Sequence, residues 1–339
     1  MTDPLECAEA TDAIRPAAVH EQYQQLLRAD VATLYQDARQ WPLRTCPLCA
    51  EGEGLLHWER PPLVYRRCAA CELVFLNPLP PESVLATYFA TAPSATYFHQ
   101  VVLSQSAARR QALLFTPRIA LLGQLVPTPA RRSLLDIGCA IGTFLAAAVT
   151  AGWQAAGLEP NQSAAKLACD AGLRVATAVG APPVTWQSGT FSVISGWEVI
   201  AHLIDPVASL QAVLPYLADD GLLVLTTPNA DGLEYRLLGA AHENVSFPFL
   251  QFFSPRTLQQ LFARLHLTVE RLETPGTMDL ENLRAHYRHV DRAGWPPAVE
   301  SLLFSETESA RRLRTECQAA VARALASGHM LGVARKAKC

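Results

Sequence analysis

The sequence predicts an α/β protein with one large sheet, preceded by a helical segment and a small cysteine-rich module. Three observations support this prediction. Apolar runs alternate with alanine-rich or amphipathic stretches from residue 133 to the end of the chain. Two Cys-x-x-Cys pairs stand before these runs, within residues 46–71. The 339 residues are 50% hydrophobic and 17% charged, which is enough to fill a sizeable core.

Seven strands are expected in the large sheet. Each is a short apolar run bounded by turn residues, and the fifth is nearly all apolar, as is typical of an interior parallel strand. The runs cover residues 133–137, 153–159, 173–177, 191–196, 221–229, 267–272 and 328–335. Helices are expected between them, and one begins at Ser254-Pro255, where Ser254 caps the helix and Pro255 takes its first position.

The loop after the first strand is built to hold a ligand. Its glycines let the backbone approach closely, and the helix that begins near Gly142 turns its N–H groups toward an anionic group. A dinucleotide fingerprint starting at Gly138 would need glycines at the positions of Ala140 and Thr143, so the spacing argues against a dinucleotide. Because a Cβ disfavours positive φ, we expect an ordinary backbone conformation at Ala140.

Residues 133–145, with Asp136, Gly138 and Gly142, resemble motif I of class I S-adenosylmethionine-dependent methyltransferases. In that family the acid at the strand end and the loop backbone hold the methionine part of the cofactor, and an acid that closes the second strand, here Glu159, binds the ribose hydroxyls. The element order is similar to the seven-stranded, Rossmann-like methyltransferase core over about residues 107–339. The cofactor-binding residues that this resemblance implies are Asp136, Gly138, Cys139, Ala140, Gly142, Glu159, Pro160, Trp197 and Glu198.

Simpler interpretations of these residues exist. Asp136 could cap a turn, and Glu159 could be a surface acid at a strand end. Trp197 could belong to the core, since an indole is more often buried packing than a shelf for a cofactor. Its place just past the fourth strand is nevertheless at the edge where open α/β sheets bind ligands.

The two cysteine pairs predict a zinc site. Eighteen residues separate them, and each Cys-x-x-Cys turn can present two thiolates on one face. Four protein ligands leave no open position, so the metal would be structural. Two disulfides are the alternative, but no secretion signal is apparent and five further cysteines are present. The expected ligands are Cys46, Cys49, Cys68 and Cys71, with strands at residues 64–67 and 73–76.

A zinc ribbon followed by a proline-rich linker, a tyrosine-containing helix and this core is similar to a group of small-molecule methyltransferases. The order divides the chain into four parts. These are an N-terminal helical segment (1–42), the zinc ribbon (43–80), a linker with helices that lead into the core (81–132, with a helix at 113–125) and the methyltransferase domain (133–339).

Two histidines are candidates for a general base. Methyl transfer requires mainly alignment, but a hydroxyl acceptor must also lose its proton. His202 follows Glu198 by four residues, so a helical turn would place both on one face. The segment is similar to that of ubiquinone-biosynthesis O-methyltransferases, in which acids and a histidine can bind a metal, but Ala201 replaces one of those acids. His242 is the second candidate, in a loop rich in aromatics. The alternative for His202 is a hydrogen-bonded, structural histidine, and the alternative for the second segment is that its phenylalanines are core anchors.

Residues 279–326 form an insertion between the sixth and seventh strands. We expect one helix from about residue 298 to residue 326. Charged residues such as Arg284, Arg288 and His289 are most simply a solvated face. The insertion could cover the acceptor pocket or make a homodimer contact, and the sequence does not choose between these roles.

Charge and localisation complete the prediction. The net charge of −3 gives no general attraction to nucleic acid, and neither a secretion signal nor a membrane-spanning run is apparent, so we expect a cytoplasmic protein. The sequence favours an S-adenosylmethionine-dependent methyltransferase that acts by in-line transfer on a small-molecule hydroxyl, of a sugar or a secondary metabolite. Carbon and nitrogen are the other acceptor atoms. A nicotinamide-dependent oxidoreductase, or an RNA methyltransferase that docks through its ribbon, are the alternatives.

Overall fold

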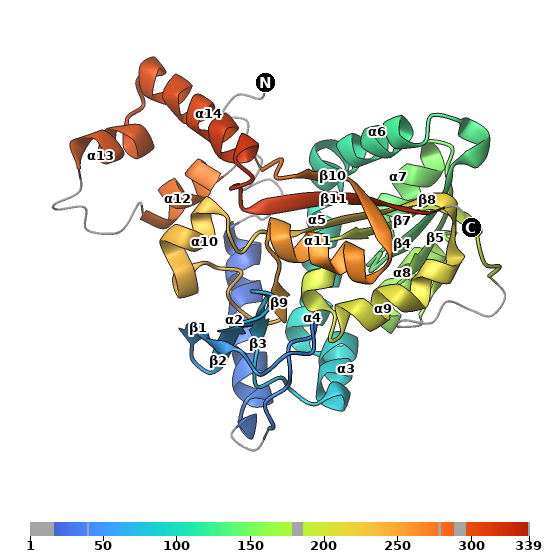
Figure 1. Ribbon diagram of the computed structural model, residues 1–339, viewed down its shortest axis with the longest axis horizontal. Coiled ribbons are helices and arrows are strands. Elements are labelled where there is room, and N and C mark those ends of the chain that lie inside the picture. The colour runs from blue at the N-terminus through green and yellow to red at the C-terminus, as the bar shows by residue number, and fades with distance from the viewer. Residues whose placement is uncertain (1–16, 39–40, 178–185, 277–278, 288–295, 338–339) are drawn as a thin grey trace.

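The computed structural model describes residues 17–38, 41–177, 186–276, 279–287 and 296–337, and its large sheet has seven strands (Figure 1). Their order is β10-β11-β8-β7-β4-β5-β6. Strands β4 to β8 are parallel to one another, whereas β11 is antiparallel to both β8 and β10. The α/β prediction is confirmed. The strands are β4 (Ser133–Ile137), β5 (Gln154–Leu158), β6 (Val175–Ala176), β7 (Phe191–Trp197), β8 (Leu217–Pro228), β10 (Leu267–Glu273) and β11 (His329–Lys336).

Helices cover both faces of this sheet. Leu222 and Val224 of β8 pack in the cluster formed with α6 (Thr116–Leu125) and α7 (Thr143–Thr150), and the alternate residues Leu223 and Leu225 pack in the cluster with α9 (Pro206–Val213) and α11 (Pro255–Arg264). The period of two along a strand that is buried on both faces explains the continuous apolar run in the sequence. Ser254 caps α11 as expected, within a capping box with Thr257.

The segments on either side of the cysteine-rich module are helical. Helix α2 (Ala17–Leu34) lies in the predicted N-terminal helical segment, whose residues 1–16 fall outside the described chain. Helix α3 (Glu82–Thr91) follows the linker, and α4 (Pro93–Tyr97), α5 (Ser104–Arg110) and α6 then continue one another. Two π-helical stretches, Phe98–Leu103 and Gln111–Phe115, join them and were not predicted. Such stretches occur often at functional sites.

The cysteine-rich module forms a second, smaller sheet that takes in one strand from the later part of the chain. Strands β1 (Leu55–Arg60), β2 (Leu63–Arg67) and β3 (Val74–Leu76) are antiparallel, and β9 (Gln251–Phe252), from the segment between β8 and α11, pairs with β3. The aromatic side chains that pack between the two parts are fully buried or nearly so, and they include Tyr65, Tyr235, Phe247 and Phe252. The cysteine-rich module and the part of the chain that carries the large sheet are therefore joined by the pairing of β3 with β9 and by a common apolar cluster.

The insertion forms α12 (Asp279–Tyr287), α13 (Pro297–Phe304) and α14 (Glu308–Arg323), and α13 and α14 project from the body of the molecule (Figure 1). The expectation of one helix over residues 298–326 is wrong. The helix is interrupted at residues 305–307, because Thr307 caps α14 by accepting the Ala310 N–H, and Arg314 donates to the free carbonyls of Leu302 and Ser305 at 2.8 and 2.9 Å.

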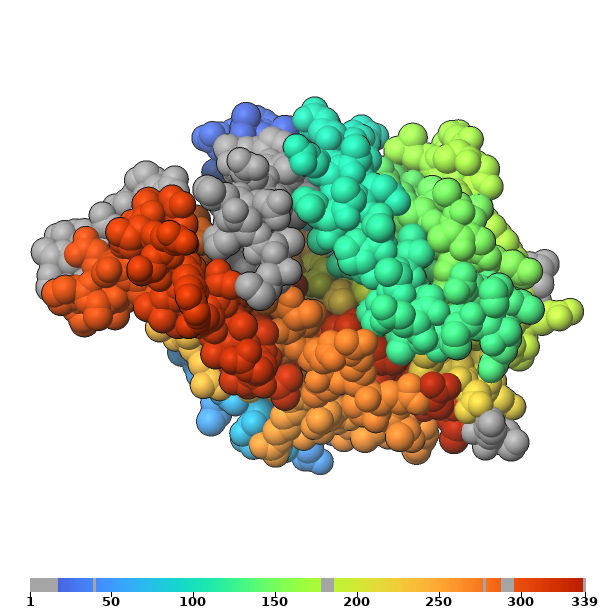
Figure 2. All heavy atoms as spheres, turned by 90° about the horizontal axis from the view of Figure 1, so that it is seen from above, coloured from blue at the N-terminus to red at the C-terminus, as the bar shows by residue number. Residues whose placement is uncertain are grey.

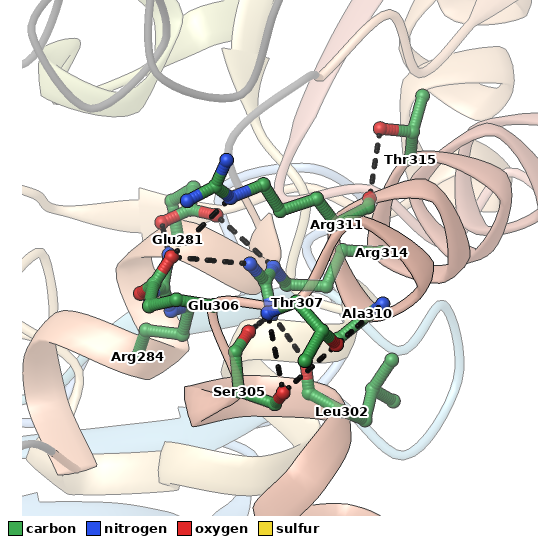
Figure 3. A network of polar contacts seen from close by, with 10 residues as sticks. All are labelled: Glu281, Arg284, Leu302, Ser305, Glu306, Thr307, Ala310, Arg311, Arg314 and Thr315. Carbon is green, nitrogen blue, oxygen red and sulfur yellow. Dashed lines mark hydrogen bonds and ion pairs between the residues drawn. The ribbon is translucent and has the colours of Figure 1, made fainter.

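The charged residues of the insertion are an ion-pair network (Figure 3). Arg284 pairs with Glu281 at 2.7 Å and with Glu306, and its side chain is 15% exposed. Arg314 is buried beside the same two acids. The expectation of a solvated face is wrong for Arg284, and Arg288 and His289 lie outside the described residues. The network fixes α12, α13 and α14 relative to one another.

No helix in the described part of the chain is long and apolar enough to cross a membrane.

Candidate active site

The site lies at the carboxyl ends of the parallel strands. Asp136, on β4, is buried, and its Oδ1 accepts a hydrogen bond of 2.5 Å from the Ser195 hydroxyl on β7. Burial raises the pKa of Asp136 to about 7, while the Ser195 bond and the charge of Arg118 act in the opposite direction. The carboxyl group is thus held at the strand edge in an environment that disfavours its charge.

The glycine loop is as tight as the sequence predicts. Gly138 has φ 69° and Gly142 has φ 78°. A Cβ at Gly138 would lie 2.5 Å from Val199 Cγ2, and one at Gly142 would lie 2.4 Å from Leu173 Cδ1. Neither position can carry a side chain without displacing its neighbours.

The expectation for Ala140 is wrong, because its φ is 49°. Its N–H donates to Glu159 Oε2 at 2.8 Å, and this bond holds the loop across the edge of the sheet. A left-handed conformation costs a non-glycine residue on the order of 1 kcal/mol. A hydrogen bond to a charged acceptor offsets a cost of this size.

Glu159 follows β5 and is buried. Its Oε1 accepts the Asn161 N–H at 2.8 Å, so each carboxylate oxygen holds one backbone N–H and retains a lone pair for a hydroxyl donor. Burial raises the pKa of Glu159, and its two backbone bonds oppose the shift. Pro160 is partly buried and lies between Glu159 and Asn161 in the chain.

Asn161 is a residue that sequence reasoning missed. It caps α8 (Gln162–Asp170) by accepting the Ala164 N–H, and its Nδ2 donates to the carbonyl of Phe89 at 2.7 Å. This second bond ties the end of α3 to the edge of the sheet. An asparagine just before a helix is a strong capping signal, but its bond to a segment 72 residues earlier has no trace in the sequence.

Cys139 faces the protein interior. Its Sγ is so close to Gly157 that a Cβ at Gly157 would lie 2.4 Å from it, and burial raises the pKa of the thiol. Cys139 can therefore contribute to ligand binding through its backbone only.

Trp197 ends β7 beside the loop. Its ring packs edge-on against Phe144 with centroids 5.3 Å apart, and the Arg118 guanidinium lies 4.6 Å from the ring centroid. Within the described residues, Trp197 Nε1 and Thr227 Oγ1 are buried without a hydrogen-bond partner. These two atoms lie at the ends of β7 and β8, and β7 lies between β8 and β4, the strand that leads into the glycine loop.

Glu198 and His202 do not share a helical face, so that expectation is wrong. Glu198 has φ 61°, and only Ile200–His202 form a short 3-10 turn. The Glu198 carboxylate lies 3.7 Å from His329 Nε2, and its charge partly opposes the burial that lowers the pKa of His202. A left-handed glutamate is strained, and such strain is often found at functional sites.

His202 has a defined tautomer. Its Nδ1 lies 2.9 Å from the carbonyl oxygen of Pro248, and a carbonyl only accepts, so Nδ1 carries the hydrogen. Burial lowers the pKa of His202, which keeps the ring neutral and leaves a lone pair on Nε2. The ring packs against Phe249 with centroids 4.7 Å apart.

His242 is held differently. It is buried, its Nε2 lies 2.9 Å from Glu234 Oε2, and its Nδ1 accepts the Asn244 N–H at 3.1 Å. Its ring stacks on Tyr235 at 3.9 Å. Because both ring nitrogens are engaged, this geometry favours the structural role for His242.

The four ribbon cysteines meet as the spacing predicts. Their sulfur atoms all lie within 4.8 Å of one another, and the pairs Cys46–Cys71 and Cys49–Cys68 are 3.5 Å apart. A tetrahedral zinc site with bonds of about 2.3 Å has sulfur atoms roughly 3.8 Å apart, so the cluster fits the ion. The two turns are alike, since Ala50 and Glu72 both have positive φ and donate to the carbonyls of Cys46 and Cys68.

One face of the molecule is hollowed between the helices that precede the sheet and the C-terminal elements (Figure 2). Phe115 and Arg118 join these helices to the sheet edge, through Phe144 and Trp197. The strand edge with the glycine loop is thus partly covered by a helix from outside the sheet.

The comparisons with known proteins agree with this arrangement. A family model described as a methyltransferase domain matches residues 85–272, which is more than half of the chain. Comparison with curated sequences finds no match.

Three solved structures illustrate the likeness. A SAM dependent methyltransferase from Archaeoglobus fulgidus has a TM-score of 0.44 and 18% identity, with 65% of this chain and 94% of that chain covered. Geranyl diphosphate C-methyltransferase from Streptomyces coelicolor A3(2) has a TM-score of 0.43 and 17% identity, with 69% and 82% covered. A chain of the complex between the Haloferax volcanii Trm112 methyltransferase activator and the putative methyltransferase has a TM-score of 0.44 and 14% identity, with 70% and 96% covered. At these identities and TM-scores, none of them identifies an acceptor.

The family match spans most of the sheet and the whole glycine loop. The protein therefore belongs to the methyltransferase-domain family and is an S-adenosylmethionine-dependent methyltransferase.

Proposed function

We propose that this methyltransferase modifies a hydroxyl group of a small molecule, with His202 as the general base. The observation that supports the proposal is the fixed tautomer of His202. Its Nδ1–H is bound to the Pro248 carbonyl, so Nε2 is the atom that can take a proton from an acceptor. A histidine that is neutral at pH 7 is suited to this task.

The donor would be held at the edge formed by β4, β5 and β7. S-adenosylmethionine, when bound, supplies a methyl group already activated on a sulfonium. Asp136 provides a negative charge for the donor's ammonium group, and Glu159 provides two oxygen atoms for the ribose hydroxyls. Gly138 and Gly142 allow the backbone to approach. The orphaned Nε1 of Trp197 and Oγ1 of Thr227 fit a polar ligand at the same edge.

The acceptor would lie toward His202 and Phe249. The segment that positions them is well anchored, because Gln251 donates to the carbonyls of Ile200 and Leu203, and the Leu250 N–H donates to the Ala201 carbonyl. The turn that carries the proposed base is therefore hydrogen-bonded to Leu250 and Gln251, at the start of β9. A fixed base in a partly dry site supports proton removal from a hydroxyl.

The ribbon cysteines would hold a structural Zn²⁺. Four thiolates close the coordination sphere, so the ion would stabilise the module and take no part in methyl transfer. The ribbon supports the acceptor side through the β3–β9 pairing.

The experiment is a transfer assay with tritiated S-adenosylmethionine and a panel of phenols, sugars, amines, activated carbon acids and bulk RNA. We expect label on hydroxyl-bearing small molecules, and mass spectrometry of the product with a trideuterated donor should place the methyl group on oxygen. Labelling of amines, carbon acids or RNA, with hydroxyl compounds inert, would show that the proposed acceptor class is wrong.

A further inference from the structure

The turn that carries His202 is held from outside. Residues Ile200–His202 form a single 3-10 turn, closed by the bond from the His202 N–H to the Val199 carbonyl at 2.9 Å. Within the described chain, four carbonyls around His202 accept from other segments, and three of these bonds come from the segment that contains β9. The fourth comes from the cysteine-rich module, because Arg44 Nη1 donates to the Ile204 carbonyl at 2.9 Å.

Arg44 is fixed on the cysteine-rich module through its backbone. It stands two residues before Cys46. Asn77, which is fully buried directly after β3, accepts the Arg44 N–H at 2.9 Å and donates to the Arg44 carbonyl at 3.0 Å. The guanidinium lies over the Phe75 ring, 5.6 Å from its centroid. Arg44 therefore joins the module to the turn that carries His202.

The Arg44 guanidinium has more hydrogen-bonding capacity than its protein partners use. Its Nε and Nη2 atoms are buried, and within the described residues neither has a hydrogen-bond partner. Burial lowers the pKa of Arg44 to about 10, and the charge of Cys46 is the largest influence that opposes the shift. The group thus stays charged at pH 7. A buried charge is costly unless an opposite charge compensates it, and a cluster of thiolates is such a charge.

Resting on the proposed function, we propose that Arg44 is a positioning residue that couples the four-cysteine site to the general base. At one end, its charge compensates the net negative charge of four thiolates around a divalent ion. At the other end, its Nη1 fixes the Ile204 carbonyl, two residues after His202. The module then contributes to methyl transfer by fixing the orientation of the His202 ring, although the metal takes no part in the reaction.

Two measurements on the zinc-loaded full chain follow the two ends of this link. NMR of protein labelled with ¹⁵N in its histidines reports the tautomer of His202 and the exchange of its Nδ1 hydrogen, and His202→Gln assigns the signal. Competition with a chromophoric chelator reports the rate of zinc release. We expect Arg44→Met to accelerate both processes about tenfold and to lower kcat with a hydroxyl acceptor by a similar factor. The Kd for S-adenosylhomocysteine should stay unchanged.

The control is Arg66→Met, which makes the same change in the same module. Arg66 Nη1 donates to the Gly54 carbonyl at 3.1 Å, so its bond stays within the module and the variant should keep the wild-type values. Arg44→Lys restores the charge without the planar fork and should recover part of each loss. If Arg44→Met does not fold, Arg44→Gln takes its place.

Three results would overturn the coupling. These are an unchanged His202 signal in Arg44→Met, an unchanged rate of zinc release in that variant, and an equal loss in Arg66→Met, which would point to packing of the module. Failure of the proposed base is a separate outcome. A wild-type His202 that carries its hydrogen on Nε2 would contradict the base, whereas a change of that signal in Arg44→Met would still support the link.

Discussion

Asp136, the acid of the proposed donor site, is placed where its charge destabilises the fold. Its carboxyl group is buried next to a single hydroxyl donor, and the pKa is raised to about 7 from 3.8. Between these two values the folded state holds a proton that the unfolded state has lost. Stability therefore falls as pH rises through this window, by about 1.4 kcal/mol per pH unit at most. The cost is fully present above pH 7.

Asp136→Asn should separate binding from stability. The amide cannot ionise, so we expect the variant to have a higher Tm than the wild type at pH 8 and a much smaller difference at pH 5. Calorimetry with S-adenosylhomocysteine should show at least about tenfold weaker binding, because a charged contact is lost. Asp170→Asn, an exposed acid on α8, is the control for both measurements. A lower Tm at pH 8 for Asp136→Asn would contradict the desolvation argument.

Two nearby positions of the glycine loop, Gly138 and Ala140, should respond differently when glycine and alanine are exchanged. Gly138→Ala places a Cβ 2.5 Å from Val199 Cγ2 at φ 69°, and we expect it to lose about 2 kcal/mol or more of unfolding free energy. Ala140→Gly removes a left-handed alanine, so the relief offsets the added chain entropy and stability should stay within about 1 kcal/mol of the wild type. Denaturant unfolding measures both. Equal losses at the two positions would contradict the assigned backbone conformations.

The residue types in the sequence indicated the chemistry of the candidate site, but they did not indicate which contacts these residues make. The spacing of Asp136, Gly138 and Gly142 indicated a donor loop, because those residue types are required by the turn. The sequence could not reveal that Glu159 binds the loop backbone at Ala140, since that bond depends on tertiary position. Arg118 was missed for the same reason, as nothing in a helix sequence shows which strand edge it covers.

Among the elements, strands and caps were the most predictable. Each expected strand of the large sheet is present, because apolar runs of that length have few alternatives in a buried sheet. The break between α13 and α14 was missed, although Thr307 is a capping residue, because the carbonyls at the end of α13 are bound by Arg314 of α14, and this contact depends on how the two helices pack. The two-residue strand β9 was also missed, since it exists only by pairing with β3.

The zinc ribbon gives a prediction at the scale of an element. Cys68→Ser removes one of four ligands, so we expect metal analysis to fall from about one zinc per chain to nearly none and the Tm to drop markedly. Cys169→Ser, at an exposed thiol, is the control and should change neither value. Full zinc content and an unchanged Tm in Cys68→Ser would contradict a four-cysteine structural site.

At the scale of the whole molecule, the four parts expected from the sequence are physically interdependent. Strand β9 belongs to the ribbon's sheet, and Tyr235 and Phe252 pack against Trp58 and Tyr65 of the ribbon. Composition changes in the sequence suggest boundaries, but they contain no information on which apolar faces meet. The insertion is joined to the same body, because Asn282 donates to Glu234, the partner of His242.

A shortened chain that begins at residue 81 tests this interdependence. It would expose Tyr235, Phe247 and Phe252, which are at most 2% exposed in the full chain. We therefore expect it to bind a hydrophobic dye and to lose cooperative thermal unfolding. A shortened chain that unfolds cooperatively at the Tm of the full chain would show that the ribbon is an independent domain.

The proposed reaction depends on His202, and one comparison tests it. With a hydroxyl acceptor from the tritium assay, His202→Gln should lower kcat about 100-fold or more while the Kd for S-adenosylhomocysteine stays unchanged. Because burial lowers the pKa of His202, the acidic limb of the wild-type rate should lie below the pH range in which a free imidazole titrates, and it should vanish in the variant. His57→Gln, on β1, should behave as wild type. A His202→Gln protein that retains full turnover with the wild-type pH profile would contradict the mechanism.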